Sequence, residues 1–237
     1  MKYFYKFLSI SLLFLACTIL LNPFPTSIYA EEGKIIYLTF DDGPGGKVTT
    51  EILDILKEEK IPATFFLIGN QIEGQEDLVN RIHEEGHSIG LHSMTHDKGK
   101  IYSSNDNFLK EMLESKEIIK NVTGVDTNIL RFPFGSNNSG YKLQESLVNL
   151  LHENNLKIYD WNVDSTDGAN HYASPSLYIK NATSDKSPII LLMHCGYINK
   201  NSVAALPEII KFYKTQGYEF RKIDNETPEL FHYINKN

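Results

Sequence analysis

Two adjacent carboxylates, Asp41 and Asp42, follow an apolar run and precede Gly43-Pro44. Because neighbouring side chains point in different directions, one carboxylate could bind a cation while the other accepts a proton. An acidic Asx-type turn is the alternative interpretation of the same residues. The dipeptide alone is compatible both with a turn and with a catalytic site in which one aspartate binds a cation and the other accepts a proton.

Two histidines, His92 and His96, stand four residues apart. On one helical turn both imidazoles can reach a single metal ion, although such a pair by itself is more often a surface coincidence. Together with Asp42 the pair supplies two imidazoles and one carboxylate, and it leaves positions for water and substrate. This ligand set is typical of a catalytic rather than a structural divalent site.

Two further segments carry residues that could act on a substrate. Arg131 precedes the turn Pro133-Phe134-Gly135. An arginine there could orient a carboxylate, and the turn could present a backbone N–H to a developing negative charge; an ordinary turn beside a surface arginine is the alternative. His194 follows the most apolar run of the chain, where either a core histidine or a catalytic acid would fit.

These residues need elements that bring them together. From residue 34 onward the hydropathy pattern predicts seven strands that alternate with helices, which indicates a parallel sheet covered by helices, either a barrel or a doubly wound sheet. Active-site residues of such folds lie where strands end. The expected strands are 35–40, 63–68, 87–91, 129–132, 157–161, 189–193 and 218–222, and the expected helices are 48–59, 77–85, 104–121, 144–154, 176–182 and 203–215.

The first thirty residues differ in character from the rest. Lys2 and Lys6 precede Phe7–Leu21, a run of 15 residues without a charge, and small residues follow it. This pattern predicts an export signal at residues 1–30 and a folded domain at 31–237. Because the apolar run is short for a spanning helix, an uncleaved signal anchor is the less favoured alternative.

The composition is that of an ordinary globular domain. With 41% hydrophobic and 22% charged residues, disordered and collagen-like classes are excluded. The formal net charge of −7 argues against nucleic acid or an anionic membrane surface as a partner. After signal cleavage we expect a monomer without a membrane partner. Cys195 would then be the sole cysteine, which excludes an internal disulfide.

Five segments in order resemble the polysaccharide deacetylase family, carbohydrate esterase family four, across residues 34–222. Each segment falls at a predicted strand end. The resemblance implies an α/β fold, a distorted (β/α) barrel with about seven strands, and metal-dependent removal of acetyl groups from a polysaccharide. The matching segments are Thr39-Phe40-Asp41-Asp42-Gly43, His92-Ser93-x-x-His96, Arg131-x-Pro133-x-Gly135, Asp164-Ser165-x-Asp167 and Leu192-x-His194.

The family pattern implies a role for each matching residue. One divalent metal ion, Zn²⁺ before Co, Ni, Mn or Fe, would be held by Asp42, His92 and His96. Asp41 would be the general base that accepts a proton from the attacking water, and Arg131 would orient it.

The same pattern implies that His194 is the general acid that protonates the departing amine. Asp167, or less favourably Asp164, would hold its imidazolium, and the Phe134 N–H would support the oxyanion. The residues expected to contact substrate are Pro133, Phe134, Gly135, Trp161 and Asp164.

Two departures from the family pattern concern substrate choice more than chemistry. Gly168 stands where a tryptophan usually forms a wall of the groove, and Cys195-Gly196 stands where an aspartate is common. The leading hypothesis is an exported N-deacetylase of peptidoglycan, acting on GlcNAc or MurNAc. The alternatives are an O-acetyl xylan esterase, a chitooligosaccharide deacetylase, and a metal-bearing glycan-binding module without activity. A binding module would require neither a base nor an acid.

Overall fold

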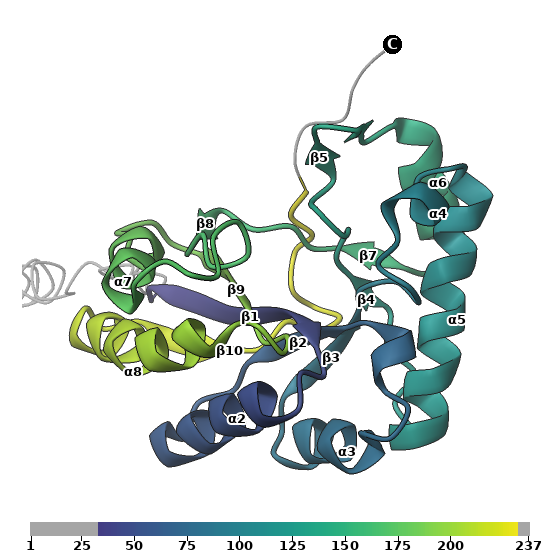
Figure 1. Cartoon of the computed structure of the whole chain (residues 1–237). Coiled ribbons are helices and arrows are strands. Elements are labelled where there is room, and N and C mark those ends of the chain that lie inside the picture. Colours follow the sequence, from purple (N-terminus) through teal and green to yellow (C-terminus); the bar gives the residue numbers. More distant parts are fainter. Residues whose placement is uncertain (1–32, 232–237) are drawn as a thin grey trace, which may run out of the picture. The chain divides into compact units, whose positions relative to one another are not determined.

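A computed structural model describes residues 33–231, so the expected export signal at residues 1–30 lies outside the described residues. Within this part of the chain, strands and helices alternate along the sequence, and the helices cover one parallel sheet (Figure 1). The strands of this sheet are β1 (Ile35–Gly43), β2 (Thr64–Leu67), β3 (Ser88–Leu91), β4 (Ile129–Leu130), β7 (Lys157–Ile158), β8 (Val163–Asp164), β9 (Ile189–His194) and β10 (Glu219–Arg221).

The sheet follows the order β7-β4-β3-β2-β1-β9-β8, and β10 pairs with the first residues of β1. Every strand pair in it is parallel. The sheet curls into an incomplete barrel whose end strands are β7 and β8 (Figure 1). This arrangement confirms the expected distorted (β/α) barrel. All seven expected strands are present, and β8 is an additional one.

The helices are α2 (Lys47–Glu59), α3 (Glu76–Glu84), α4 (Lys98–Ile101), α5 (Asn105–Thr123), α6 (Glu145–Glu153), α7 (Pro175–Ala182) and α8 (Lys200–Thr215). A 3-10 turn, η1 (Gly69–Gln71), and an antiparallel hairpin of β5 (Asn137–Asn138) and β6 (Tyr141–Lys142) complete the described elements. No helix within residues 33–231 combines the length and apolar composition that a membrane span requires.

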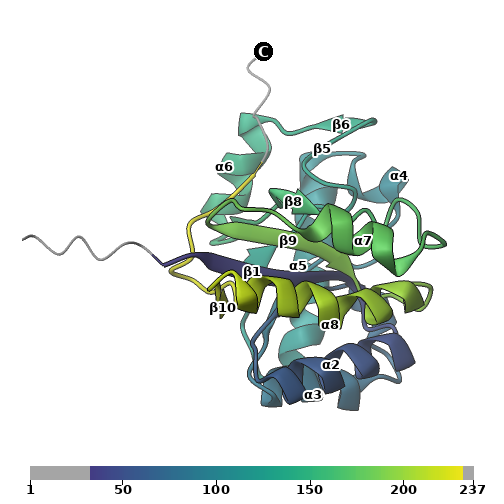
Figure 2. The ribbon, with the colours of Figure 1, turned by 90° about the vertical axis from the view of Figure 1, so that its left-hand side faces the viewer.

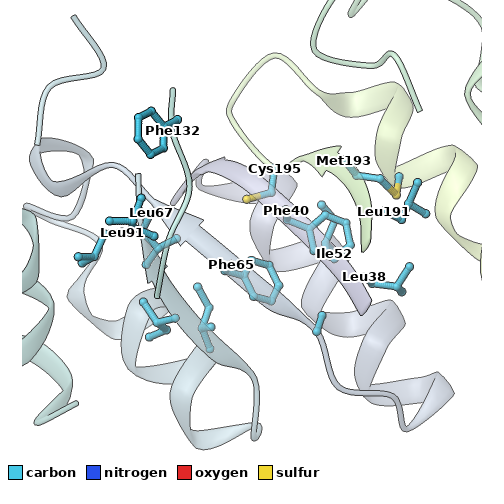
Figure 3. Close-up of a cluster of buried hydrophobic side chains, with 14 of the residues drawn as sticks. Leu38, Phe40, Ile52, Phe65, Leu67, Leu91, Phe132, Leu191, Met193 and Cys195 are labelled. Carbon is cyan, nitrogen blue, oxygen red and sulfur yellow. The ribbon is translucent and has the colours of Figure 1, made fainter. Parts of the chain in front are cut away.

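The central strands are buried on both faces, as parallel strands between two layers must be. On the helix side, Phe40 and Phe65 stack with their ring centroids 5.2 Å apart, and Ile52 of α2 lies near them (Figure 3). Each such side chain stabilises the fold by about 1.5–3 kcal/mol on burial. On the other side of the sheet, a smaller cluster that includes Phe66 and Tyr159 fills the barrel interior.

Helix α5 illustrates how local sequence sets the element bounds. The hydroxyl of Ser104 accepts a hydrogen bond from the N–H of Asn107, which caps the first turn. Buried Phe108 and Met112 then follow at helical spacing. Gly124 ends the helix with a φ of +75°, a left-handed conformation that costs glycine little.

Candidate active site

The five sequence segments meet in one pocket of about 360 Å³ at the carboxyl ends of the strands. Its wall contains every candidate residue named from the sequence except Arg131, Asp167 and Pro133, and it also contains Gly168, Ala169 and Leu192. Arg131 and Asp167 are fully buried. The topology explains this convergence, because parallel strands present their carboxyl ends at the same edge of a sheet.

Asp42, His92 and His96 bring three potential metal ligands together. The Asp42 Oδ1 atom lies 3.4 Å from His92 Nε2 and 3.3 Å from His96 Nε2. Within residues 33–231, no other group of three such side chains converges in this way. The His92 Nδ1 atom lies 3.0 Å from the Arg131 carbonyl oxygen, so Nδ1 carries the proton and the Nε2 lone pair faces Asp42.

The donor set fits a divalent cation. The buried Asp42 Oδ1 atom accepts no hydrogen bond from the described residues, although it faces two imidazoles. A lone pair that faces a carboxylate oxygen is unfavourable unless a proton or a metal cation lies between them. Two histidines and one aspartate are ligands that Zn²⁺ and similar ions accept.

Charge and burial set the protonation states of Asp42 and His96. Burial opposes ionisation of Asp42, but adjacent His92 and the charges of His194 and His96 outweigh it and keep the pKa of Asp42 well below its usual range. Burial and the nearby His92 lower the pKa of His96 to about 4. At neutral pH the carboxylate is therefore ionised and the His96 imidazole is neutral, the forms that bind a metal.

The loop that carries the two histidines is held by a residue that the sequence interpretation missed. Glu111 of α5 is buried, and it accepts hydrogen bonds from the Thr95 N–H (2.8 Å) and the Thr95 hydroxyl (2.9 Å). Ser93 and His96 have positive φ values of 67° and 55°, so this loop is strained where it presents the imidazoles. The available signal was a glutamate on the apolar face of an amphipathic helix.

Arg131 fixes Asp41. Its Nη1 donates to Asp41 Oδ1 (2.8 Å) and to the Thr39 hydroxyl (2.6 Å), while its Nε donates to the Tyr159 carbonyl (2.7 Å). The guanidinium also stacks 4.3 Å above the Phe66 ring. With Oδ1 engaged by arginine, Asp41 Oδ2 faces the ligand group, 3.8 Å from the Nε2 atom of His92.

The turn after β4 presents Phe134 to the pocket but not Pro133. Phe134 has a φ of +64°, and its ring lies 4.6 Å from the His96 ring. Pro133 is buried, and its carbonyl accepts a 2.5 Å hydrogen bond from the Tyr102 hydroxyl. The Ser136 N–H donates to Asp160, which anchors the other end of the turn.

The structure places Asp167 rather than Asp164 against His194. Asp167 Oδ1 lies 2.8 Å from His194 Nδ1, and Oδ2 accepts from the His194 N–H (2.9 Å) and the Ser202 hydroxyl (2.5 Å). Burial lowers the pKa of His194, but the charge and hydrogen bond of Asp167, followed by the charges of Asp42 and Asp41, outweigh it and raise that pKa to about 9.

Asp164 has a different surrounding. Its Oδ1 atom accepts a 2.7 Å hydrogen bond from the Thr166 N–H, and Thr166 has a φ of +66°. Burial raises the pKa of this carboxyl. Asp164 therefore stabilises the turn after β8 while also lining the pocket.

The His194 imidazole fills the space beside Gly168. A Cβ atom at position 168 would lie 2.3 Å from His194 Cε1, so no side chain fits there while the imidazole keeps its place. Trp161 lines the pocket beside Gly135, where an added Cβ would lie 2.9 Å from the indole. Glycine at position 168, where the family pattern has tryptophan, is therefore compatible with this position of the imidazole.

Cys195 belongs to the core rather than to the reacting groups (Figure 3). Burial raises the pKa of its thiol, so the thiolate needed for a nucleophile does not form at neutral pH. Its carbonyl accepts a 2.9 Å hydrogen bond from the Thr49 hydroxyl, which in turn accepts from the Gly45 N–H (2.8 Å). Thr49, also missed from the sequence, ties the loop after β1 to the loop after β9.

An incomplete (β/α) barrel with a candidate metal site at the carboxyl ends of its strands defines an enzyme of the (β/α)-barrel class. The family model for polysaccharide deacetylase matches residues 29–150. The chain belongs to the polysaccharide deacetylase family, as its motifs predict, and the family's members are hydrolases.

Relatives agree with this assignment. A peptidoglycan-N-acetylglucosamine deacetylase of Bacillus cereus is 39% identical over 209 residues, which cover 86% of this chain and 74% of the relative. The peptidoglycan-N-acetylglucosamine deacetylase PgdA of Listeria monocytogenes is 33% identical over 196 residues, which cover 82% of this chain and 39% of that longer protein.

Solved structures share the fold. A polysaccharide deacetylase from Bacillus cereus superposes with a TM-score of 0.74 at 38% identity, and the match covers 84% of this chain and 97% of the other. The catalytic domain of a peptidoglycan N-acetylglucosamine deacetylase from Eubacterium rectale superposes with a TM-score of 0.78 at 33% identity. The match covers 87% of this chain and 96% of the other.

Proposed function

We propose that this chain removes N-acetyl groups from amino-sugar residues of peptidoglycan, with N-acetylglucosamine favoured over N-acetylmuramic acid by the names of its relatives. One observation carries the proposal. A single pocket holds three converging metal ligands, a carboxylate fixed by a buried arginine, and an imidazole paired with a buried carboxylate. Metal-dependent hydrolysis of an amide uses these three functions together.

Asp42, His92 and His96 would hold one divalent ion, with Zn²⁺ as the expected metal. When bound there, such an ion supplies Lewis-acid polarisation of the acetyl carbonyl and acidifies water. Asp41 accepts the proton of the attacking water through Oδ2, because Arg131 already occupies Oδ1.

The remaining roles fall to Phe134 and His194, which also line the pocket. The Phe134 N–H donates to the oxygen on which negative charge develops. His194 enters the reaction as an imidazolium, because Asp167 raises its pKa, and it gives its proton to the departing amine. The amine leaves as a neutral group, and acetate is the second product.

The setting of the reaction is part of the same proposal. The chain would be exported by the signal at residues 1–30, and the domain at 31–237 would act as a monomer outside the cell or at the cell wall. The peptidoglycan-directed names of the relatives support this location, since their substrate lies outside the membrane.

The substrate is tested by incubating the purified protein with peptidoglycan, chitooligosaccharides and acetylxylan, and by measuring the acetate that each releases. Asp41→Asn serves as the matched control for contaminating esterases. We expect the highest kcat/KM on peptidoglycan. Release from acetylxylan alone would instead identify an O-acetyl esterase, and release only from soluble chitin oligomers would identify a chitooligosaccharide deacetylase.

A further inference from the structure

The loop between β9 and α8 carries an exposed tyrosine that is fastened in place. Tyr197 is 57% exposed, and its hydroxyl accepts a 2.7 Å hydrogen bond from the side-chain amide of Gln75. The same amide accepts from the Gly46 N–H (2.9 Å) and donates to the Pro44 carbonyl (3.0 Å). An exposed aromatic ring is thus fixed to the segment that follows the metal-ligand candidate Asp42.

One edge of the ring lies close to Gly46. A Cβ atom at Gly46 would lie 3.1 Å from Tyr197 Cε1, a tighter approach than usual for a side chain. The neighbouring Ile198 is 61% exposed. Tyr197 and Ile198 together form an exposed apolar step, here called the 197–198 step, on this loop.

The 197–198 step follows directly on a segment, His194–Gly196, that borders the pocket-lining residues Asp41 and Asp42. Gly196 lies against Asp42, since a Cβ at Gly196 would be 3.3 Å from the Asp42 Cβ. The Cys195 N–H donates to the Asp41 carbonyl (2.8 Å), which holds the two loops side by side. Tyr197 is three residues beyond His194, so the Cα atoms of the two residues are at most about 11 Å apart. β1 and β9, which carry these loops, are neighbours in the sheet (Figure 2).

We propose that the 197–198 step binds a second sugar ring of the glycan, adjacent to the residue that is deacetylated. Amino-sugar rings expose faces of C–H groups that pack on aromatic side chains, and a tyrosine with few rotatable bonds loses little entropy on contact. The inference rests on the proposed function and adds that the preferred substrate is an oligomer of N-acetylated amino sugars. Tyr197 does not line the pocket itself, so its effect depends on substrate length.

The test compares kcat/KM for N-acetylglucosamine oligomers from the dimer to the pentamer. In the wild type we expect kcat/KM to rise with length. Tyr197→Ala should reduce the pentamer-to-dimer ratio about three- to tenfold, mainly through KM, because the contact acts in binding. Tyr197→Phe keeps the ring, so its pentamer-to-dimer ratio of kcat/KM should stay close to that of the wild type.

Tyr172 provides the matched control. It is 86% exposed on the loop after β8 and packs on His171, with ring centroids 4.0 Å apart. Tyr172→Ala should leave the length ratio unchanged. An unchanged ratio in Tyr197→Ala, or an equal fall in Tyr172→Ala, would overturn the subsite. Absence of acetate release by the wild type from every N-acetylated glycan, peptidoglycan included, would overturn the proposed function instead.

Discussion

Glu111, on the buried face of α5, accepts hydrogen bonds from both the N–H and the hydroxyl of Thr95, the residue that precedes His96. A buried carboxylate is costly unless its oxygens are hydrogen-bonded. Here the donors belong to the loop that presents the two imidazoles, so hydrogen bonds connect α5 directly to the candidate metal site. Glu111 is therefore a positioning residue for His96.

Replacement of Glu111 by alanine should weaken metal binding without removing a ligand. Loss of such a supporting contact typically costs 10- to 100-fold in affinity, and we expect a change of about that size. Glu111→Gln keeps one acceptor oxygen and should have a smaller effect. Competition with a chromophoric chelator measures the Zn²⁺ affinity. Wild-type affinity in a folded Glu111→Ala protein would show that the loop holds its own shape.

The two neighbouring aspartates should respond differently to the same substitution. Asp41→Asn should keep the metal and lose turnover by about 10²- to 10⁴-fold, because a general base has been removed. Asp42→Asn should lower the metal affinity itself. Metal content by elemental analysis and kcat at saturating metal separate the two effects. Near-normal turnover in Asp41→Asn combined with normal affinity in Asp42→Asn would refute the assigned roles.

The pH at which activity falls on the alkaline limb of the pH–activity profile should depend on Asp167. His194 has a pKa raised to about 9, so it is protonated below that pH and loses its proton above it. Asp167→Asn removes the main stabilising charge and should move the limb to lower pH. Asp164→Asn should move it less, because that carboxylate bonds the Thr166 N–H. A limb that moves only in Asp164→Asn would reverse the two roles.

His87 should make the fold sensitive to acid. Its Nδ1 accepts from the Ala63 N–H, and burial lowers its pKa from 6.5 to about 4, with Lys222 and Arg81 adding to the shift and Glu85 opposing it. The unfolded chain binds this proton more readily, so stability is complete above about pH 6.5 and falls toward pH 4. The full loss is about 3 kcal/mol.

Denaturant unfolding of wild type and His87→Gln across this pH range measures the effect. Other titrating groups remain in both proteins, so the difference in slope isolates His87. We expect the variant to be less stable at pH 7 and to lose less stability on acidification. Parallel pH profiles for the two proteins would show that His87 does not titrate in this window.

Much of the fold was predictable because the long strands are buried runs. β1 begins with apolar residues and β9 consists almost entirely of them, and both strands start where expected; β1 extends three residues and β9 one residue further than expected. β4 and β7 are shorter than expected, since the chain turns away after two paired residues and Arg131 enters the barrel interior. β8 was missed because its two residues have no apolar run around them.

The part of the candidate site that lies at strand ends was predictable. The part that depends on side chains from a helix distant in the sequence was not. Asp41, Asp42 and His194 lie at the carboxyl ends of the neighbouring strands β1 and β9, so topology alone brings them to one edge. Glu111 lies on a helix, and nothing local in the sequence connects it with Thr95. Such contacts follow from the way a helix packs, which residue spacing does not encode.

Acetate release from peptidoglycan should require one divalent ion held by Asp42, His92 and His96. The decisive experiment titrates Zn²⁺ into metal-stripped protein and measures bound metal and acetate release on the same samples. We expect one ion per chain, activity that rises in parallel with occupancy, and neither binding nor activity at that site in His92→Ala. Full activity in protein shown by elemental analysis to contain no metal would refute the metal requirement.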